Sequence, residues 1–254
     1  MLSEGQDTYG VLGDEAETFM FDDIGVIFFA ATNTTQVSVN NALKYLYMDK
    51  YADVRKKLVQ EVDSNLPFSV WDAQGNEVNH DKLYASCNYE NIHEGYDYAM
   101  MTFNESLRIE PPLGFSTAHT VTRDVTLARG TAKELKINAG EEIHIMIGLL
   151  HHDPAQWGNR HDEFIPERFD SKSEYFSKPG GKHRHPYSFA PFLGGHRVCL
   201  GKTMAEIQAK AMLVMITKCY ELEHLDSELK TKTRAYELFQ MQLPSLRYRF
   251  KKRI

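Results

Sequence analysis

The 254-residue sequence has few cysteines: Cys87, Cys199 and Cys219, which lie far apart along the chain. An odd number of widely separated cysteines provides neither a disulfide framework nor the paired ligand spacing of a zinc finger. This pattern favours a reducing compartment. It also means that a cysteine in an unusual local sequence needs its own explanation.

The sequence also lacks an excess of basic charge and a long hydrophobic run. Its 29 basic and 35 acidic residues give a net charge of -6 and are spread along the chain, so nucleic acid is not an expected partner. The most apolar run, residues 24–31, is much shorter than the ~20 residues that span a membrane, and no signal peptide precedes it. We therefore expect no membrane anchor in this chain, and a cytoplasmic location if nothing else attaches it to a membrane.

Hydrophobic periodicity predicts a mainly α chain with small β-sheets, the α+β class. Residues 15–48 lack proline and become apolar on nearly every face, which predicts a long helix through a core. Further helices are predicted at residues 50–66, 96–112 and 200–222, and the first two end at prolines. Strands are predicted at 120–127, 141–150 and near the C-terminus, and the aromatic residues of segment 151–191 favour a packed loop.

The segment PFLGGHRVCLGK, residues 191–202, places Cys199 in a glycine-rich loop just before a predicted helix. The N–H groups at a helix start favour a negative charge, and a thiolate is a soft, strongly donating metal ligand. Gly194 and Gly195 permit a turn with positive φ, and Gly201 lets the backbone approach the cysteine. Arg197 is placed to pair with an anionic group of a cofactor.

One thiol without a second Cys or His at a metal-finger spacing favours a single axial ligand to haem iron rather than a zinc site. The loop by itself leaves two alternatives open. Cys199 is then either a buried structural cysteine or a reactive thiol beside a glycine-rich turn.

This loop resembles the haem-binding signature of the cytochrome P-450 superfamily, F-x-x-G-x-R-x-C-x-G. The matching residues are Phe192, Gly195, Arg197, Cys199 and Gly201. The resemblance implies that Cys199 ligates the iron of haem b (iron protoporphyrin IX). Phe192 would shield the sulfur and Arg197 would hold a haem propionate.

Two further motifs of the family follow the expected order. Glu105 and Arg108 in ESLR match the E-x-x-R helix motif, and FIPERF supplies Arg168. A Glu and an Arg three residues apart share one helix face, where they usually form only a solvated pair. The resemblance implies instead a structural network of Glu105, Arg108 and Arg168 behind the haem loop.

The long first helix contains AATNTT, residues 30–35, which resembles the family's dioxygen-binding segment. The resemblance implies that Thr34 helps to deliver protons. Asn33 replaces the usual acid and cannot carry a proton as a carboxylate does. His119 occupies the place of a common propionate-binding arginine and can still donate to a carboxylate. Without the other motifs, these threonines would be incidental residues of a packed helix.

The resemblance therefore implies a haem-thiolate monooxygenase that activates dioxygen with NADPH-derived electrons from a reductase and inserts one oxygen atom into a small apolar substrate. A basic segment, residues 182–186 with Lys202, would face the reductase, or it is simply a solvated loop. The alternatives are an inactive haem-binding or structural fragment, favoured by the short chain, and a haem-thiolate isomerase or peroxygenase, favoured by Asn33.

The resemblance covers residues 1–254 as the C-terminal part of one cytochrome P-450 domain, from the long central helix to the C-terminus. We expect the N-terminal half of such a domain, with most of the substrate pocket, to be absent from this sequence. A full-length eukaryotic member would lie at the surface of the endoplasmic reticulum membrane.

Overall fold

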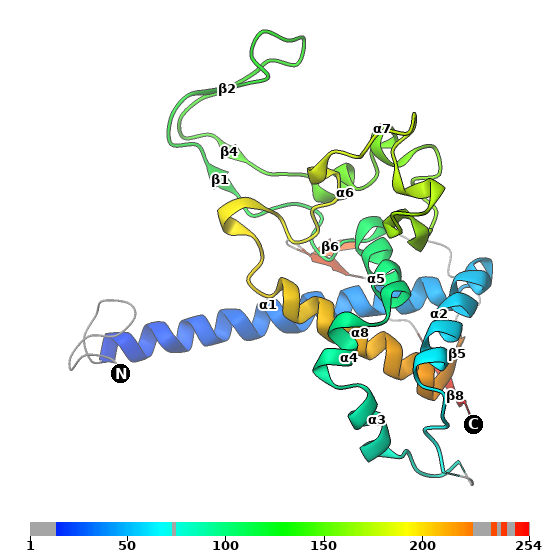
Figure 1. Cartoon of the computed structure of the whole chain (residues 1–254). Helices are drawn as coiled ribbons and strands as arrows, with labels where there is room; N and C mark the ends of the chain where they lie inside the picture. Colours follow the sequence, from blue (N-terminus) through cyan, green and yellow to red (C-terminus); the bar gives the residue numbers. More distant parts are fainter. Residues whose placement is uncertain (1–13, 73–74, 226–234, 238–239, 243–246, 254) are drawn as a thin grey trace.

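The structure is a computed structural model that describes residues 14–72, 75–225, 235–237, 240–242 and 247–253. It is mainly helical with four small antiparallel sheets, as the sequence predicts (Figure 1). The polar start of the chain and parts of the C-terminal strand prediction lie outside the described residues.

The elements follow one another in a helical half, a loop-rich middle and a C-terminal helix with strands. The helices are α1 (Asp14–Leu46), α2 (Ala52–Asn65), α3 (His80–Ser86), α4 (Tyr89–Glu94), α5 (Asp97–Ile109), α6 (Ile147–Leu150), α7 (Pro154–Trp157) and α8 (Lys202–Cys219). Short 3-10 turns are η1 (Asp49–Tyr51), η2 (Pro166–Phe169), η3 (Glu174–Phe176), η4 (Pro186–Ser188) and η5 (Gly195–Arg197).

Each sheet consists of two antiparallel strands. The strands are β1 (His119–Thr120) with β4 (Glu142–Ile143), β2 (Val125–Leu127) with β3 (Leu135–Ile137), β5 (Tyr220–His224) with β8 (Tyr248–Lys252), and β6 (Ala235–Glu237) with β7 (Gln240–Gln242). In the β5–β8 pair Leu222 lies opposite Phe250. The single strands expected at 120–127 and 141–150 are wrong: the first is divided between β1 and β2, and in the second only β4 is a strand, while residues 147–150 form α6.

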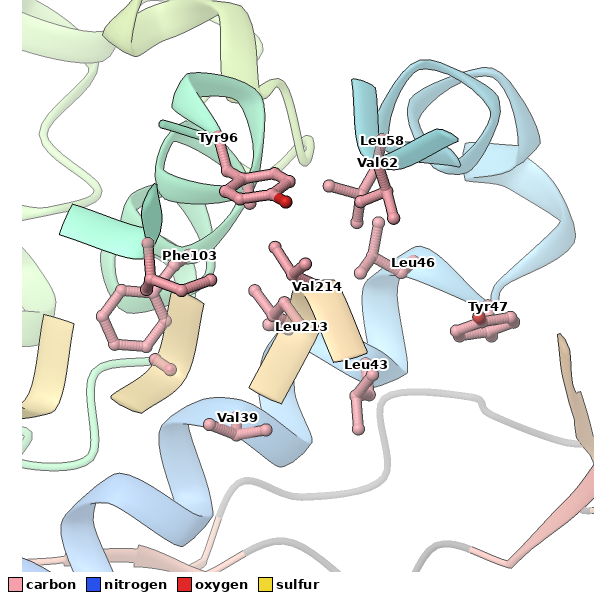
Figure 2. Close-up of a cluster of buried hydrophobic side chains, with 14 of the residues drawn as sticks. Val39, Leu43, Leu46, Tyr47, Leu58, Val62, Tyr96, Phe103, Leu213 and Val214 are labelled. Carbon is pink, nitrogen blue, oxygen red and sulfur yellow. The ribbon is translucent and has the colours of Figure 1, made fainter. Parts of the chain in front are cut away.

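The main core forms where four helices meet. Val39, Leu43 and Leu46 of α1 and Leu58 and Val62 of α2 face α8, and Phe103 of α5 packs in the same cluster. Figure 2 shows these side chains around Leu213 and Val214 of α8. Each such aliphatic side chain contributes roughly 1.5–3 kcal/mol by leaving water, so α8 and the second half of α1 are held firmly against α5.

Local sequence determines how α5 begins and ends. Its first turn is capped from α2, since the Glu61 carboxylate accepts from Tyr98 N at 2.7 Å and from Ala99 N at 3.0 Å. The helix ends at Ile109 because Pro111 and Pro112 follow, as the sequence predicts. α5 is therefore fixed at both ends, and it carries the E-x-x-R residues.

The first half of α1 differs from the expected core helix. All its residues from 18 to 30 are exposed, and this half of the helix extends beyond the rest of the chain in Figure 1. Phe28 and Phe29 are 70% and 69% exposed. The sequence correctly predicts the length of the helix, but only its second half, from Val39 onward, lies in the core.

Candidate functional site

The cysteine loop, residues 191–201, leads from η4 into α8 and carries Cys199 on an exposed surface. The loop is closed by two backbone hydrogen bonds: Leu193 N donates to Ala190 O at 3.0 Å, and Cys199 N donates to Phe192 O at 2.9 Å. The ring of Phe192 packs against the main core. One side of the loop is thus fixed to the protein, and the side with the thiol faces outward.

The three glycines of the loop differ in backbone conformation and in the space around them. Gly195 adopts the positive φ that the sequence predicts, at 68°. The same expectation for Gly194 is wrong: its backbone is extended, and Leu193 has the positive φ instead. A Cβ at Gly194 would lie 2.9 Å from Cε1 of Tyr187, so a larger residue there would require the exposed Tyr187 ring to shift. A Cβ at Gly201 would meet Cys199 Sγ at 3.9 Å, an ordinary contact.

The side chains of residues 196–200 are exposed. Arg197 and Val198 are exposed, and Leu200 is 94% exposed. Helix α8 begins at Lys202, not at residue 200 as the periodicity predicts, and Lys202 N donates to Cys199 O at 3.4 Å. Cys199 therefore lies three residues before the helix. Its neighbours in the sequence are the apolar Val198 and Leu200, and the cationic Arg197 is two residues before it.

The structure brings Glu105, Arg108 and Arg168 together in the interior. Arg108 donates from Nε to Glu105 Oε2 at 2.7 Å and from Nη2 to Oε1 at 2.9 Å. Arg168 Nε donates to the same Oε1 at 3.2 Å. The three side chains are at most 3% exposed. This is a charge-assisted, nearly bidentate network rather than the solvated pair that spacing alone favours.

The two arginines also bind the backbone of the loop-rich middle segment. Arg108 Nη1 donates to the carbonyl oxygens of His151 at 2.9 Å and His161 at 2.7 Å. Arg168 Nη1 donates to Trp157 O at 2.8 Å. Burial lowers the pKa of Arg168. Carbonyl oxygens from the segment 151–163 thus surround the network and supply the acceptors that buried guanidinium groups require.

A residue that sequence reasoning placed elsewhere joins this region. Arg184 belongs to the basic segment 182–186, yet it turns inward and donates to Gln156 O at 3.0 Å, to Arg168 O at 3.3 Å and to Tyr175 O. Its guanidinium lies 4.3 Å from the ring centre of Trp157, which Arg108 also approaches at 5.0 Å. Burial lowers the pKa of Arg184 to about 10. The solvated-loop interpretation is therefore wrong for Arg184, whereas Lys182, His183 and His185 are exposed.

The predicted oxygen-binding segment lies on α1 near the boundary between its exposed and buried halves. Thr34 is half-buried, and its hydroxyl donates to Ala30 O at 2.7 Å, four residues back. Thr32 donates in the same way to Phe28 O at 2.8 Å. Asn33 is half-buried between them. These hydroxyls are already placed to compete for backbone carbonyls, which favours a local opening of the helix.

His119 is exposed on β1, opposite Ile143. Its Nδ1 lies 2.9 Å from Thr117 O. A backbone carbonyl only accepts, so this contact assigns the ring proton to Nδ1 in the neutral form.

Sequence reasoning did not find a second buried ion pair, between α1 and the end of α5. Lys44 Nζ lies 2.6 Å and 2.7 Å from the two carboxylate oxygens of Glu110, and Tyr45 OH donates to Oε1 at 2.9 Å. Asn41 Nδ2 donates to Glu110 O at 2.9 Å. Asn41, Lys44 and Tyr45 lie within about one turn of each other on the buried half of α1, but α1 carries many other polar residues, so no clear signal in the sequence marks this pair.

Comparisons with known proteins agree with this arrangement. The sequence profile of the family described as Cytochrome P-450 matches residues 20–251. Cytochrome P-450 CYP13A7 of Caenorhabditis elegans is 31% identical over 207 residues, which cover 80% of this chain and 34% of that protein. Cytochrome P-450 734A5 of Oryza sativa subsp. japonica is 39% identical over 121 residues, covering 48% and 20% respectively.

A further relative and a solved structure complete the comparison. Thromboxane-A synthase of Sus scrofa is 28% identical over 171 residues, 67% of this chain and 27% of that protein. The crystal structure of a cytochrome P-450 (CYP102L1) superposes with a TM-score of 0.75 at 20% identity, covering 100% of this chain and 49% of that one. The chain therefore spans about a fifth to a third of the curated relatives, and it belongs to the cytochrome P-450 family.

Within the described residues, no helix combines the length and the apolar composition needed to cross a membrane.

Proposed function

We propose that this member of the cytochrome P-450 family is a haem-thiolate monooxygenase in which Cys199 is the ligand of the haem iron. The observation that carries the proposal is the pairing of two features: an exposed thiol on a loop closed by backbone hydrogen bonds, and a buried network of Glu105, Arg108 and Arg168. A fixed loop with an accessible sulfur is what a single axial thiolate requires.

The donor set of the loop fits haem. Cys199 offers one sulfur ligand, Val198 and Leu200 offer exposed apolar contacts, and Arg197 offers an exposed cation for a propionate. Gly195 allows the positive φ with which the loop turns toward the cysteine. His119 is the second propionate donor in this proposal, since its ring can donate to a carboxylate.

Haem, when bound, supplies reductive dioxygen activation, with one oxygen atom entering a small apolar substrate and the other leaving as water. The Thr34 hydroxyl donates to Ala30 O and can rotate to donate a proton toward the site instead. Asn33 can donate and accept hydrogen bonds through its amide but does not titrate. Proton delivery in this chain therefore depends on the Thr34 hydroxyl and on water.

We further propose that electrons derived from NADPH arrive through a reductase at the exposed basic side chains Lys182, His183 and Lys202. Electrostatic complementarity of this kind mainly accelerates encounter and weakens as salt is added. The whole protein is proposed to work at the surface of the endoplasmic reticulum membrane, where apolar substrates concentrate.

The ligation test uses the reduced carbon-monoxide complex of haem-loaded protein. The native protein is expected to show the far red-shifted Soret band of thiolate ligation, and Cys199→Ala is expected to lose it while Cys87→Ala keeps it. A band that survives Cys199→Ala would overturn the assignment. Turnover of an apolar substrate with reductase and NADPH then tests the monooxygenase reaction itself.

A second candidate is a haem-thiolate isomerase or peroxygenase of the same fold, favoured by the amide of Asn33 where the family usually has an acid. Such an enzyme takes its oxygen from a peroxide substrate and needs no reductase. Activity that persists without reductase and NADPH, and that is unchanged in Thr34→Ala, would select this candidate over the monooxygenase.

A further inference from the structure

His151 is a fully buried imidazole that connects two distant segments. It follows α6, and its Nδ1 lies 3.2 Å from Leu107 O near the end of α5. On the other side of the ring, Ala190 N donates to Nε2 at 2.9 Å. The ring also packs on Phe189, with 5.2 Å between the ring centres. One side chain thus joins the helix of the E-x-x-R motif to the start of the cysteine loop.

The partners of the imidazole determine where its proton lies. Leu107 O can only accept a hydrogen bond, so Nδ1 carries the proton. Ala190 N–H can only donate, so Nε2 must present its lone pair. His151 is therefore a neutral ring with one defined tautomer. Protonation at Nε2 would set two N–H groups against each other.

The surroundings of the ring keep it neutral. Burial lowers the pKa of His151 to about 3, and the positive charge of Arg108 and the neighbouring His152 act in the same direction. Arg108 Nη1 also donates to the backbone carbonyl of His151. The backbone of residue 151 is thus bound to the buried network, and its side chain is bound to the loop.

The contact at Ala190 continues to the cysteine. Ala190 O accepts from Leu193 N, and Phe192 O accepts from Cys199 N. Three hydrogen bonds therefore hold the backbone of residues 190–193. The first is the bond from Ala190 N to the imidazole of His151, and the other two are those of Ala190 O and Phe192 O. A shift of Ala190 would also displace Phe192, whose carbonyl oxygen accepts the hydrogen bond from Cys199 N.

We propose that His151 is a positioning residue that holds the cysteine loop in register with the E-x-x-R helix through its neutral, Nδ1-protonated ring. This role rests on the proposed function, since it matters for chemistry only if Cys199 ligates haem. The bond to Ala190 is the one that acts on the loop, and the bond to Leu107 orients the ring.

The first test needs no haem. In the full chain labelled with ¹⁵N-histidine, NMR is expected to show one imidazole with a protonated Nδ1 and an unprotonated Nε2 between pH 5 and 8. Backbone amide exchange is expected to be slow at Ala190. A His151 signal that titrates in this range, or that has its proton on Nε2, would overturn the proposal.

Two variants separate the two hydrogen bonds. The amide oxygen of His151→Gln reaches the place of Nε2 and can still accept from Ala190, whereas the shorter amide of His151→Asn reaches only the place of Nδ1. Exchange at Ala190 and Cys199 is expected to accelerate at least tenfold in His151→Asn and much less in His151→Gln. Equal protection in both variants, at equal thermal stability, would contradict a role in the loop.

Haem-loaded protein supplies the second readout. At equal haem content, His151→Asn is expected to show a smaller fraction of the thiolate-type carbon-monoxide band, and His151→Gln is expected to restore most of it. If native protein shows no such band, the proposed function fails, but the exchange result stands. If native protein shows the band and both variants keep it in full, the positioning role fails by itself.

Discussion

Two regions of the chain carry motifs of the same family and differ in what surrounds them. The network region, Glu105 with Arg108 and Arg168, is closed: every charged group has partners within this chain, and all three side chains are at most 3% exposed. The exposed region, residues 18–30 of α1 with residues 194–200 of the cysteine loop, has its side chains at the surface. The side chains of the network are therefore held by contacts within this chain, whereas the side chains of the exposed region face solvent.

This difference predicts where substitutions act. A change in the network region leaves a buried charge without its partner, so it lowers the free energy of unfolding. A change in the exposed region removes few contacts within the chain, so it alters binding while stability stays nearly constant.

The largest effect is expected for Glu105→Ala. Removing the carboxylate leaves two buried guanidinium groups with one partner fewer, which costs about 3–5 kcal/mol of unfolding free energy and prevents haem retention. Urea unfolding followed by circular dichroism measures the loss of unfolding free energy, and haem content after gel filtration measures haem retention.

A matched control for Glu105→Ala is Glu223→Ala on β5. Glu223 pairs with Lys251 at 2.9 Å, but its side chain is 43% exposed. Water screens exposed pairs of this kind, so Glu223→Ala is expected to lower the unfolding free energy far less than Glu105→Ala does. Equal losses in the two variants would remove the distinction between the two regions.

The same comparison can be made within α1 itself. Leu46→Ala opens a cavity in the main core and is expected to lower the unfolding free energy by about 2–5 kcal/mol. Phe29→Ala changes a side chain that is 69% exposed and is expected to stay within about 0.5 kcal/mol. Urea midpoints of the two variants decide the matter, and a large loss in Phe29→Ala would show that the exposed half of α1 is packed in solution.

A smaller effect is expected from pH. The folded-state pKa of His151, about 3, is below its usual value of 6.5, so its contribution to stability is complete above pH 6.5 and is lost as pH falls toward 3. Within this window, the contribution of His151 to the unfolding free energy changes by up to about 1.4 kcal/mol per pH unit.

Carboxyl groups also contribute to the pH dependence, since burial raises the pKa values of the half-buried Glu61 and Glu206. The measurement is therefore the difference between native protein and His151→Gln in urea unfolding at pH 5 and pH 7. Native protein should lose more stability than the variant. Equal slopes would show that His151 is not buried as a neutral ring.

The sequence predicts features that depend on neighbouring residues. It does not predict features that depend on contacts between residues far apart in the sequence. Prolines fix the ends of α2 and α5 locally, and the spacing of Cys199 with its glycines is visible in one short segment. Strand β5 starts at Tyr220, although periodicity extends the helix to residue 222, because Tyr220 pairs with Lys252 of β8, which is distant in the sequence. The inward turn of Arg184 likewise depends on a carbonyl of Gln156 and on the ring of Trp157.

Apolar composition has a similar limit. The run around Phe28 and Phe29 predicts burial, because apolar side chains gain free energy on leaving water. Whether a given face is covered depends on which other elements lie beside it, and the helices that cover residues 39–46 of α1 do not extend to residues 18–30. The contact of His151 with Ala190 spans 39 residues, and no local pattern marks it.

The smallest effect on stability is expected at Cys199. Here the exposed and buried regions can be compared through the alkylation rates of the three cysteines. Cys199 is exposed, Cys87 is half-buried and Cys219 is buried, and burial raises the thiol pKa values of the latter two. Only the thiolate is alkylated, so iodoacetamide should modify Cys199 first and Cys219 last. Cys199→Ser should change the unfolding free energy by less than about 0.5 kcal/mol.

Added haemin sharpens this test. If Cys199 binds the iron, haemin should slow alkylation of Cys199 and leave the rate at Cys87 unchanged, because Cys87 is half-buried and packs against the main core and the cluster of Trp71 and Leu83, outside the exposed loop. Peptide mass spectrometry after timed alkylation measures each rate in the same sample. Protection of Cys87 together with Cys199 would indicate general compaction, and rapid alkylation of Cys199 with haemin bound would place the iron on another ligand.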